Sequence, residues 1–152
     1  MPRRAPEKKQ RRSYSGKKKH HTQKAQVVAD PKTKRVVATS FSEGKKHDFK
    51  LFQESRLPLL PQTECLADSG YLGLAKQHQN SRLPKKKSKL YPLTPEQKEA
   101  NRQLSRERFV IEHIIRSLKI FRILAERYRN RRKRFCLRFN LIAALYNYEL
   151  AL

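Results

Sequence analysis

The side chains best suited to chemistry in this sequence are a few carboxylates. Asp68 follows a short apolar run, Glu112 lies in a strongly helical stretch, and Asp48 follows His47 at the start of a third apolar segment. Two or three such groups can hold a pair of divalent cations that activate an attacking oxygen and stabilise the leaving oxygen in phosphoryl transfer. Ligation by oxygen favours Mg²⁺ or Mn²⁺. The commoner alternatives are an Asx turn for Asp68 and a helix cap or turn for Asp48.

Basic groups surround Glu112 in the stretch SRERFVIEHIIRSLK, residues 105 to 119. On a helix with about 100° per residue, four polar side chains fall within an arc of roughly 60°: Ser105, Arg108, Glu112 and Lys119. A broad apolar arc lies beside them, so the helix would have a buried stripe with a carboxylate and cations at its edge. Arg108, Arg116 and Lys119 would contact phosphates. The alternative is the solvated face of an amphipathic helix with ordinary intrahelical ion pairs.

The charge balance limits the kind of partner. The 152 residues carry 37 Lys and Arg against 13 Asp and Glu, a formal net charge of +24. Such a chain repels itself unless a polyanion neutralises it, and nucleic acid is the natural candidate because bound phosphates release counterions. No apolar run approaches the roughly 20 residues that span a bilayer, and the start MPRRAPEKKQRR has no apolar signal core. We therefore expect a cytoplasmic protein that binds nucleic acid rather than a membrane.

The other constellations are weak. Five histidines show no recognised zinc spacing, and Cys65 and Cys136 form no CxxC pair, so both are expected to be reduced thiols. No P-loop, GxGxxG or GxSxG motif occurs, and we expect no small-molecule substrate. Three aromatic residues could stack on bases but are more often part of a core: Tyr14, Phe41 and Tyr71.

The elements that must position these residues follow a dense run of positive charge in residues 1–24, which favours a basic arm. Residues 26–30 and 35–41 are predicted to be strands joined by a turn that starts with Asp30-Pro31, and hence a hairpin. Residues 47–55 are predicted to be a short helix. Residues 64–67 are predicted to be a buried strand that ends at the Asp68 turn, where sites form in α/β sheets. Two further short elements are expected, a helical turn at 72–75 and a strand within the basic loop at 81–89.

From Thr94 onward the pattern is helical. All four glycines and all eight prolines lie at or before Pro95, and Thr94 with Gln97 forms a capping box. A helix is predicted from about residue 95 to 128, then a basic joint at 128–135. A second helix at 135–150 is apolar on most sides, so we expect it to be largely buried. The order of elements is that of an α/β domain spanning residues 25–152.

Several of these segments, in this order, resemble one family. Ser105-x2-Arg108-x3-Glu112-x6-Lys119 is similar to the Tyr-x2-Arg-x3-Glu-x6-Lys signature of bacterial insertion-sequence transposases with an Asp-Asp-Glu (DDE) site, with serine where tyrosine is usual. Other segments that agree are YSGKKKH at 14–20, GKKHDF at 44–49, LADSGYLG at 66–73, FRILAERYRNRRKRF at 121–135 and FNLIAALYN at 139–147. Over nearly its whole length the chain thus resembles DDE transposases of the insertion-sequence-five type, which are related to Harbinger transposases.

The resemblance implies an RNase H-like fold and cleavage and transfer of DNA strands that depend on Mg²⁺ or Mn²⁺. The second catalytic Asp of such enzymes ends a central strand and matches Asp68, and the catalytic Glu lies on the following long helix and matches Glu112. Both would be metal ligands, and Asp48 matches a motif position that is a further candidate. The implied DNA-binding residues are Ser105, Arg108, Arg116 and Lys119.

The N-terminal side departs from the family. The family's first catalytic Asp lies on the first strand, shortly before the basic segment that precedes YSGKKK, and no acidic residue precedes Glu7 here. We therefore expect an RNase H-like domain truncated at its N-terminus, with the first strand missing and no first catalytic Asp, that ends in two long helices. Alone it should be marginally stable and cleave DNA little or not at all.

Two kinds of function remain open. The chain would be the second reading frame of a split element, completed by an upstream-frame product or by full-length transposase at DNA element ends. Alternatively, it would be a non-enzymatic basic nucleic-acid-binding protein, a transposition regulator or a relic. In either case the expected location is the bacterial cytoplasm, in association with the nucleoid.

Overall fold

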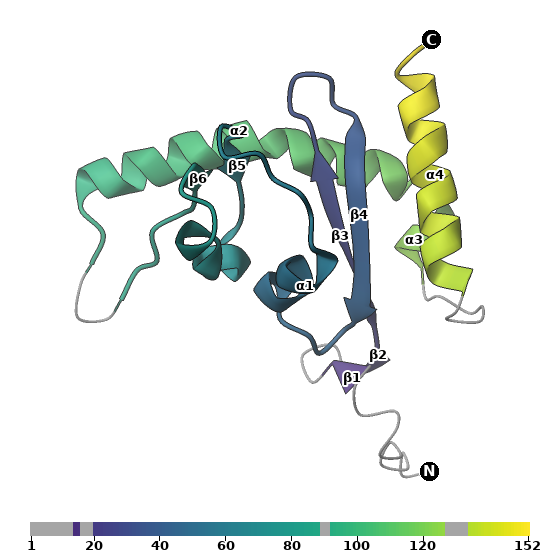
Figure 1. Cartoon of the computed structure of the whole chain (residues 1–152), viewed down its shortest axis with the longest axis horizontal. Helices are drawn as coiled ribbons and strands as arrows, with labels where there is room; N and C mark the ends of the chain where they lie inside the picture. The colour runs from purple at the N-terminus through teal and green to yellow at the C-terminus, as the bar shows by residue number, and fades with distance from the viewer. Residues whose placement is uncertain (1–13, 16–19, 89–91, 127–133) are drawn as a thin grey trace.

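The computed structural model describes residues 14–15, 20–88, 92–126 and 134–152 (Figure 1). The predicted basic arm is outside this description at residues 1–13 and 16–19, as is most of the predicted joint at 128–135. The described elements form a mixed α/β arrangement, as predicted. In chain order they are β1 (Tyr14–Ser15), β2 (His20–His21), β3 (Gln23–Ala29), β4 (Val36–Glu43), α1 (Asp48–Ser55), β5 (Cys65–Leu66), the 3₁₀ helix η2 (Ser69–Lys76), β6 (Ser81–Arg82), α2 (Pro95–Leu118), α3 (Arg122–Ala125) and α4 (Phe135–Glu149).

A long hairpin of β3 and β4 stands at the centre of the molecule (Figure 1). The two strands pair antiparallel, starting with Gln23 opposite Glu43. Asp30 builds the turn, because its carboxylate accepts hydrogen bonds from the Lys32 amide at 3.0 Å and from the Thr33 hydroxyl at 2.8 Å. The predicted hairpin and its turn chemistry are therefore confirmed.

Two smaller strand pairs complete the described β structure. β1 pairs antiparallel with β2, and β5 pairs in parallel with β6. Within the described ranges the three pairs remain separate two-stranded sheets. The crossover between β5 and β6 contains η2, which includes the helical turn predicted at 72–75. β5 lies within the strand predicted at 64–67, but its two residues are only partly buried, whereas the prediction was a buried strand. The predicted helix at 47–55 is α1.

α2 begins as its local signals predict, but it ends earlier. The Thr94 hydroxyl accepts a hydrogen bond from the Gln97 amide at 3.3 Å, and the Gln97 side chain accepts one from the Thr94 amide at 3.4 Å. The predicted continuation to about residue 128 is wrong, because α2 ends at Leu118 and α3 follows after a turn. After this turn, Ile123 and Leu124 of α3 pack against the core. The described chain thus ends in three helices rather than in two long ones.

α4 is confirmed as a helix, but the prediction that it is largely buried is wrong. Its buried residues are Phe139, Ile142 and Ala143, whereas Leu137 and Leu141 on the opposite face are 70% and 60% exposed. A helix that is apolar on all sides carries no signal for which side is covered. Among the helices that the structure describes, α4 included, none is long and apolar enough to cross a membrane.

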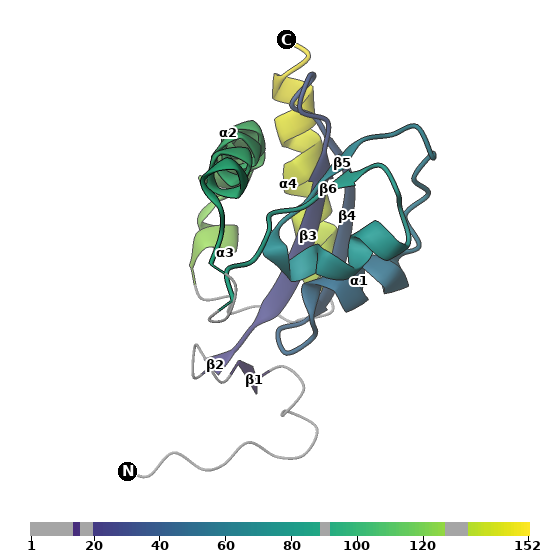
Figure 2. The ribbon, with the colours of Figure 1, turned by 90° about the vertical axis from the view of Figure 1, so that its left-hand side faces the viewer.

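The core lies where the hairpin, α2 and α4 meet. Phe41 of β4 makes edge-to-face contacts with Phe135 and Phe139 of α4, at ring distances of 5.8 and 5.3 Å. Figure 2 shows α2 and α3 on one side of the hairpin and α1 on the other. The helix that carries Glu112 therefore packs on the side of the hairpin opposite α1. The buried residues of this core are Val36, Ile114, Leu118, Phe139, Ile142 and Ala143.

Candidate functional site

Asp68 lies between β5 and η2 and faces α2. The strand pair fixes this point of the chain, because the Ala67 amide donates a hydrogen bond to the Arg82 carbonyl oxygen at 3.2 Å. One carboxylate oxygen of Asp68 accepts a hydrogen bond from the Ser69 amide at 2.5 Å, and the other lies 3.5 Å from Nη2 of Arg108. Asp68 is therefore the N-cap residue of η2, whereas the Asx turn considered as an alternative would use the amide two residues further on. The same carboxylate also meets α2, and it is 60% exposed, so a ligand can reach it.

A second group of charges holds α2 against the β5–β6 pair. Arg82 on β6 donates two hydrogen bonds to Glu107 of α2, at 2.6 and 2.9 Å, and one to Glu64 at 3.3 Å. These bonds raise the pKa of the Arg82 guanidinium, the bond to Glu107 being the larger cause. Because Glu107 precedes Arg108, the forked contact sets how closely Arg108 approaches the Asp68 turn. Arg82 and Glu107 were not among the predicted site residues, since no local signal pairs residues this far apart.

The predicted polar residues of α2 share one face of the helix, and Lys119 follows directly after the last helical residue. Glu112 follows Arg108 by one turn, and residues four positions apart on a helix have Cβ atoms roughly 5–6 Å from each other. Ser105, Glu112 and Arg116 are exposed, and among the described residues Glu112 has no ion-pair partner. Lys119 is the C-cap residue of α2. The structure thus brings one predicted acid into contact with α2 and places the second acid in the adjacent turn.

Asp48 occupies a different environment from the other two candidate acids. It is the first residue of α1, but the N-cap residue is His47, so the helix-cap alternative for Asp48 is not confirmed. Nζ of Lys24 lies 2.8 Å from Oδ1 of Asp48. Its Oδ2 would lie 2.8 Å from a Cβ atom at Gly70, so glycine is needed for α1 to approach the Asp68 turn this closely. Asp48 is therefore near the Asp68 turn but is neutralised by a lysine of the hairpin.

Tyr71 connects the Asp68 turn to the hairpin. Its hydroxyl donates a hydrogen bond of 3.4 Å to the side-chain oxygen of the buried Gln26, and its ring meets that of Phe52 edge-on. Burial, with smaller contributions from the charges of Asp48 and Asp68, raises the pKa of Tyr71 to about 12. From sequence, Tyr71 was predicted only to stack on bases or to belong to a core. The structure makes it a half-buried link between β3 and the turn that carries Asp68.

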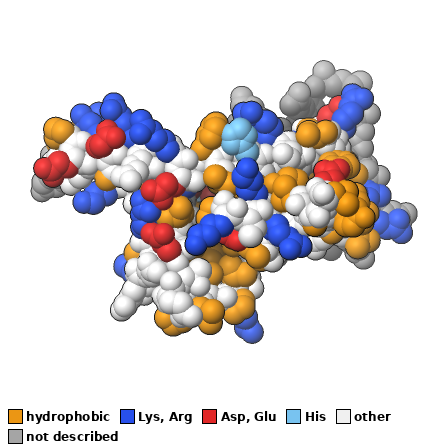
Figure 3. Space-filling view, turned by 90° about the horizontal axis from the view of Figure 1, so that it is seen from above, with side chains coloured by type: hydrophobic (Ala, Val, Ile, Leu, Met, Phe, Trp, Pro, Cys, Tyr) orange, Lys and Arg blue, Asp and Glu red, His pale blue; other side chains and the backbone are white. Residues whose placement is uncertain are grey.

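The fit of a divalent cation is incomplete. In the ranges that the structure describes, no three His, Cys, Asp or Glu side chains are arranged to hold a metal ion. Asp68 and Glu112 are two carboxylates, and the first is already paired with Arg108. Figure 3 shows a face of the molecule on which lysine and arginine side chains are interspersed with acidic ones. Such a surface suits a polyanion better than a small neutral ligand.

Comparisons with known proteins identify the family of the chain. Residues 1–147 match the family model described as DDE superfamily endonuclease. The chain is 48% identical over 147 residues to the "Probable transposase for insertion sequence element IS702" of Microchaete diplosiphon. The alignment covers 97% of this chain and 53% of that protein, so the chain spans about half the length of this relative. No solved structure matches the chain. The chain belongs to the DDE superfamily endonucleases, a family that normally uses divalent metal ions.

Proposed function

We propose that this chain is part of a DDE transposase of the insertion-sequence-five type, in which Asp68 and Glu112 are two of the catalytic carboxylates for cleavage and transfer of DNA strands. The observation that carries the proposal is the contact between the Asp68 turn and Arg108, with Glu112 in the next turn of the same helix. This contact joins the β5–β6 pair to α2 across 40 positions of sequence. A domain of residues 25–152 with an RNase H-like arrangement is part of this proposal.

Mg²⁺ or Mn²⁺ would supply the activation of an attacking oxygen in such an enzyme. The described residues do not make up a complete metal site, so a further carboxylate from outside them is needed. The source that we propose is an upstream-frame product or a full-length transposase. Asp48 is the less suitable donor, since Lys24 already neutralises it.

The basic face of α2 would hold the DNA. Arg116 and Lys119 are exposed and lie on the same side of the helix as Glu112, with Ser105 one turn before Arg108. Phosphate contacts of this kind position a nucleic acid without reading its bases. The cations would therefore place a phosphodiester near Asp68 and Glu112, while the sequence preference arises elsewhere.

A cleavage assay with two polypeptides tests the proposal. The chain is mixed with the remaining half of an IS702-type transposase and with a plasmid that carries the genomic segment encoding the chain. Nicking that needs Mg²⁺ is expected only in the mixture, and Asp68→Asn or Glu112→Gln should abolish it. Glu99→Gln is the matched control, since Glu99 lies on the same helix in an exposed pair with Arg102. Nicking that survives both site variants refutes the assignment of these residues.

A second candidate function is non-enzymatic binding of nucleic acid, as by a regulator or a relic that occupies element ends. The net charge of +24 and the incomplete acid set favour it. It predicts binding that weakens steeply with salt, because each neutralised phosphate contributes about −0.9 to the slope of log K against log salt concentration. Affinity should then be indifferent to Asp68→Asn and Glu112→Gln. Affinity that barely changes with salt contradicts this function.

A further inference from the structure

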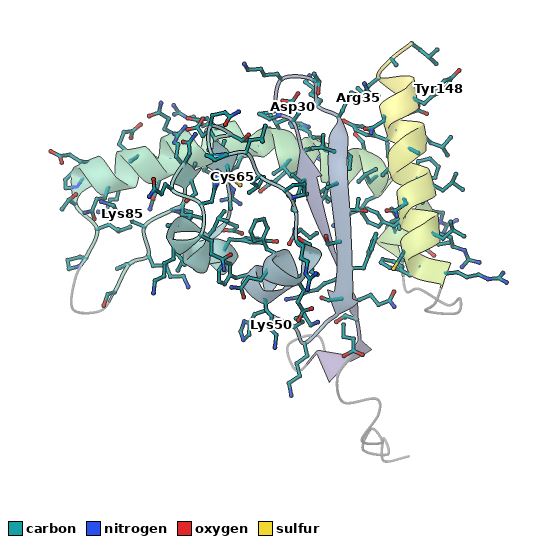
Figure 4. The ribbon with its side chains drawn as sticks, viewed as in Figure 1. Asp30, Arg35, Lys50, Cys65, Lys85 and Tyr148 are labelled. Atoms are coloured by element: carbon teal, nitrogen blue, oxygen red, sulfur yellow. The ribbon has the colours of Figure 1, made fainter. Side chains whose placement is uncertain are left out.

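α4 presents apolar side chains on two opposite faces, and the described structure covers only one of them. Figure 1 shows α4 at one end of the molecule beside β4, and Figure 4 shows Tyr148 on its outer side. The outer side chains recur every three or four positions and so form one stripe. Their exposed fractions are 70% for Leu137, 60% for Leu141, 44% for Leu145, 64% for Tyr148 and, just beyond the helix, 90% for Leu152.

We propose that this stripe is where two copies of the chain pair, with α4 packed antiparallel against α4 of the second copy. The first reason is electrostatic. Arg138 and Glu149 are the charged residues of α4, so the helix is neutral within a chain of charge +24. A second copy can approach this face without the repulsion that the rest of the surface imposes, and a polyanion gains nothing there.

The second reason is that the stripe is complementary to itself. A two-fold axis near Ala144 places Leu141 of one copy beside Tyr148 of the other, since these positions lie three and four residues from the axis. Arg138 and Glu149 lie six and five residues from the axis, on the same side of the stripe. The antiparallel arrangement therefore brings Arg138 of each copy toward Glu149 of the other, as an isologous interface requires. A parallel arrangement would instead leave these opposite charges 11 positions, about 16 Å, apart along the helix axes.

The third reason is that α4 is fixed to β4, which keeps the stripe in place, and that the residue at the centre of the stripe has a small side chain. Asn147 binds the backbone of Val36 and Asn140 binds the Thr39 hydroxyl, so one flank of α4 is fixed to β4. A pre-formed surface loses little conformational freedom on association. The exposed Ala144 at the axis lets the two helices approach closely, as packed helices do at roughly 8–10 Å between axes.

Disulfide trapping tests the geometry. Both native cysteines are first replaced in the full chain, by Cys65→Ser and Cys136→Ser. One variant then carries Ala144→Cys at the proposed axis, and the matched variant carries Ala151→Cys seven residues from the axis. Mild oxidation without nucleic acid should convert the first variant to a species of twice the 18.0 kDa chain mass and leave the second monomeric. Cross-linking of both variants refutes the antiparallel arrangement, and cross-linking of neither refutes the interface.

Sedimentation at 0.5 M salt, where charges on the two copies are well screened, tests the stripe itself. Leu141→Glu should weaken the association at least about tenfold. Leu60→Glu is the control, because Leu60 is 61% exposed, like Leu141, but lies in a loop outside α4. Circular dichroism checks that both variants keep their helices. A wild-type chain that stays monomeric, or equal effects of the two substitutions, overturns the proposal without affecting the proposed catalytic role of Asp68 and Glu112.

Discussion

The side chain of Asn147 fastens α4 to the start of β4, and its removal gives a sharp test of how the fold is held together. Its Nδ2 donates a hydrogen bond to the Val36 carbonyl oxygen, and its Oδ1 accepts one from the Val36 amide, both at 2.8 Å. Val36 is 8% exposed and belongs to the core. A single amide side chain thus satisfies both backbone groups of a buried residue 111 positions earlier in the chain.

The expected cost of Asn147→Ala follows from these two bonds. Each contributes about 0.5–1.5 kcal/mol to the free energy of unfolding, and the abandoned backbone groups add to the loss where water cannot reach them. Alanine regains up to about 0.7 kcal/mol through its better helix propensity. The net destabilisation is therefore about 2 kcal/mol. At a urea dependence of about 2 kcal/mol per molar, the midpoint of unfolding should fall by about 1 M.

Urea unfolding followed by circular dichroism at one protein concentration measures this shift. Asn140→Ala is the control, because it loses one exposed bond of 2.6 Å to the Thr39 hydroxyl and should change stability by less than about 0.5 kcal/mol. Asn147→Asp keeps the acceptor but loses the donor, so it should be at least as destabilising as Asn147→Ala. Equal stability of Asn147→Ala and the wild type would refute the reasoning.

Three further perturbations test the environment of the candidate site. Burial and two nearby carboxylates raise the pKa of Tyr71 from 10.0 to about 12, so the stability that its neutral form contributes is present below pH 10 and lost as the pH rises toward 12. An absorbance titration should show a tyrosine ionising near pH 12 that Tyr71→Phe removes; an unchanged curve contradicts this. Burial also raises the pKa of the Cys65 thiol, so the exposed Cys136 should react first with a thiol reagent, and a fast phase that survives Cys136→Ser would disprove the assignment. A Cβ at Gly73 would overlap the Phe49 ring, so Gly73→Ala should destabilise by about 1–3 kcal/mol in urea unfolding. Adding Phe49→Leu should recover part of the loss, and no recovery would show that another contact is responsible.

The parts of the fold that sequence could predict are those determined by neighbouring residues. The start of α2 was predictable because Thr94 and Gln97 satisfy each other's backbone groups within one turn. The hairpin turn was predictable because Asp30 binds the residues immediately after it. The end of α2 was not predictable, since the helical pattern continues past Leu118 and the turn depends on how α3 packs.

In the candidate site too, features set by neighbouring residues could be predicted and features set by distant residues could not. The spacing of Arg108 and Glu112 is enough by itself to place them on one face of a helix. Asp68 approaches that face beside the contact between Arg82 and Glu107, and no pattern in the sequence predicts that these two residues pair. Burial of α4 could not be predicted either, because its two apolar faces look alike in the sequence while only one packs against β4.

The bond between Val36 and Asn147 also affects the protein while it is being made. A ribosome that adds about 5–20 residues per second needs roughly 5–20 s to synthesise the residues between these two positions. For part of this time the hairpin is synthesised but the helix that covers its apolar face is not. The apolar face of β4 is then without α4, so the core of the nascent chain can close only when translation reaches the last helix.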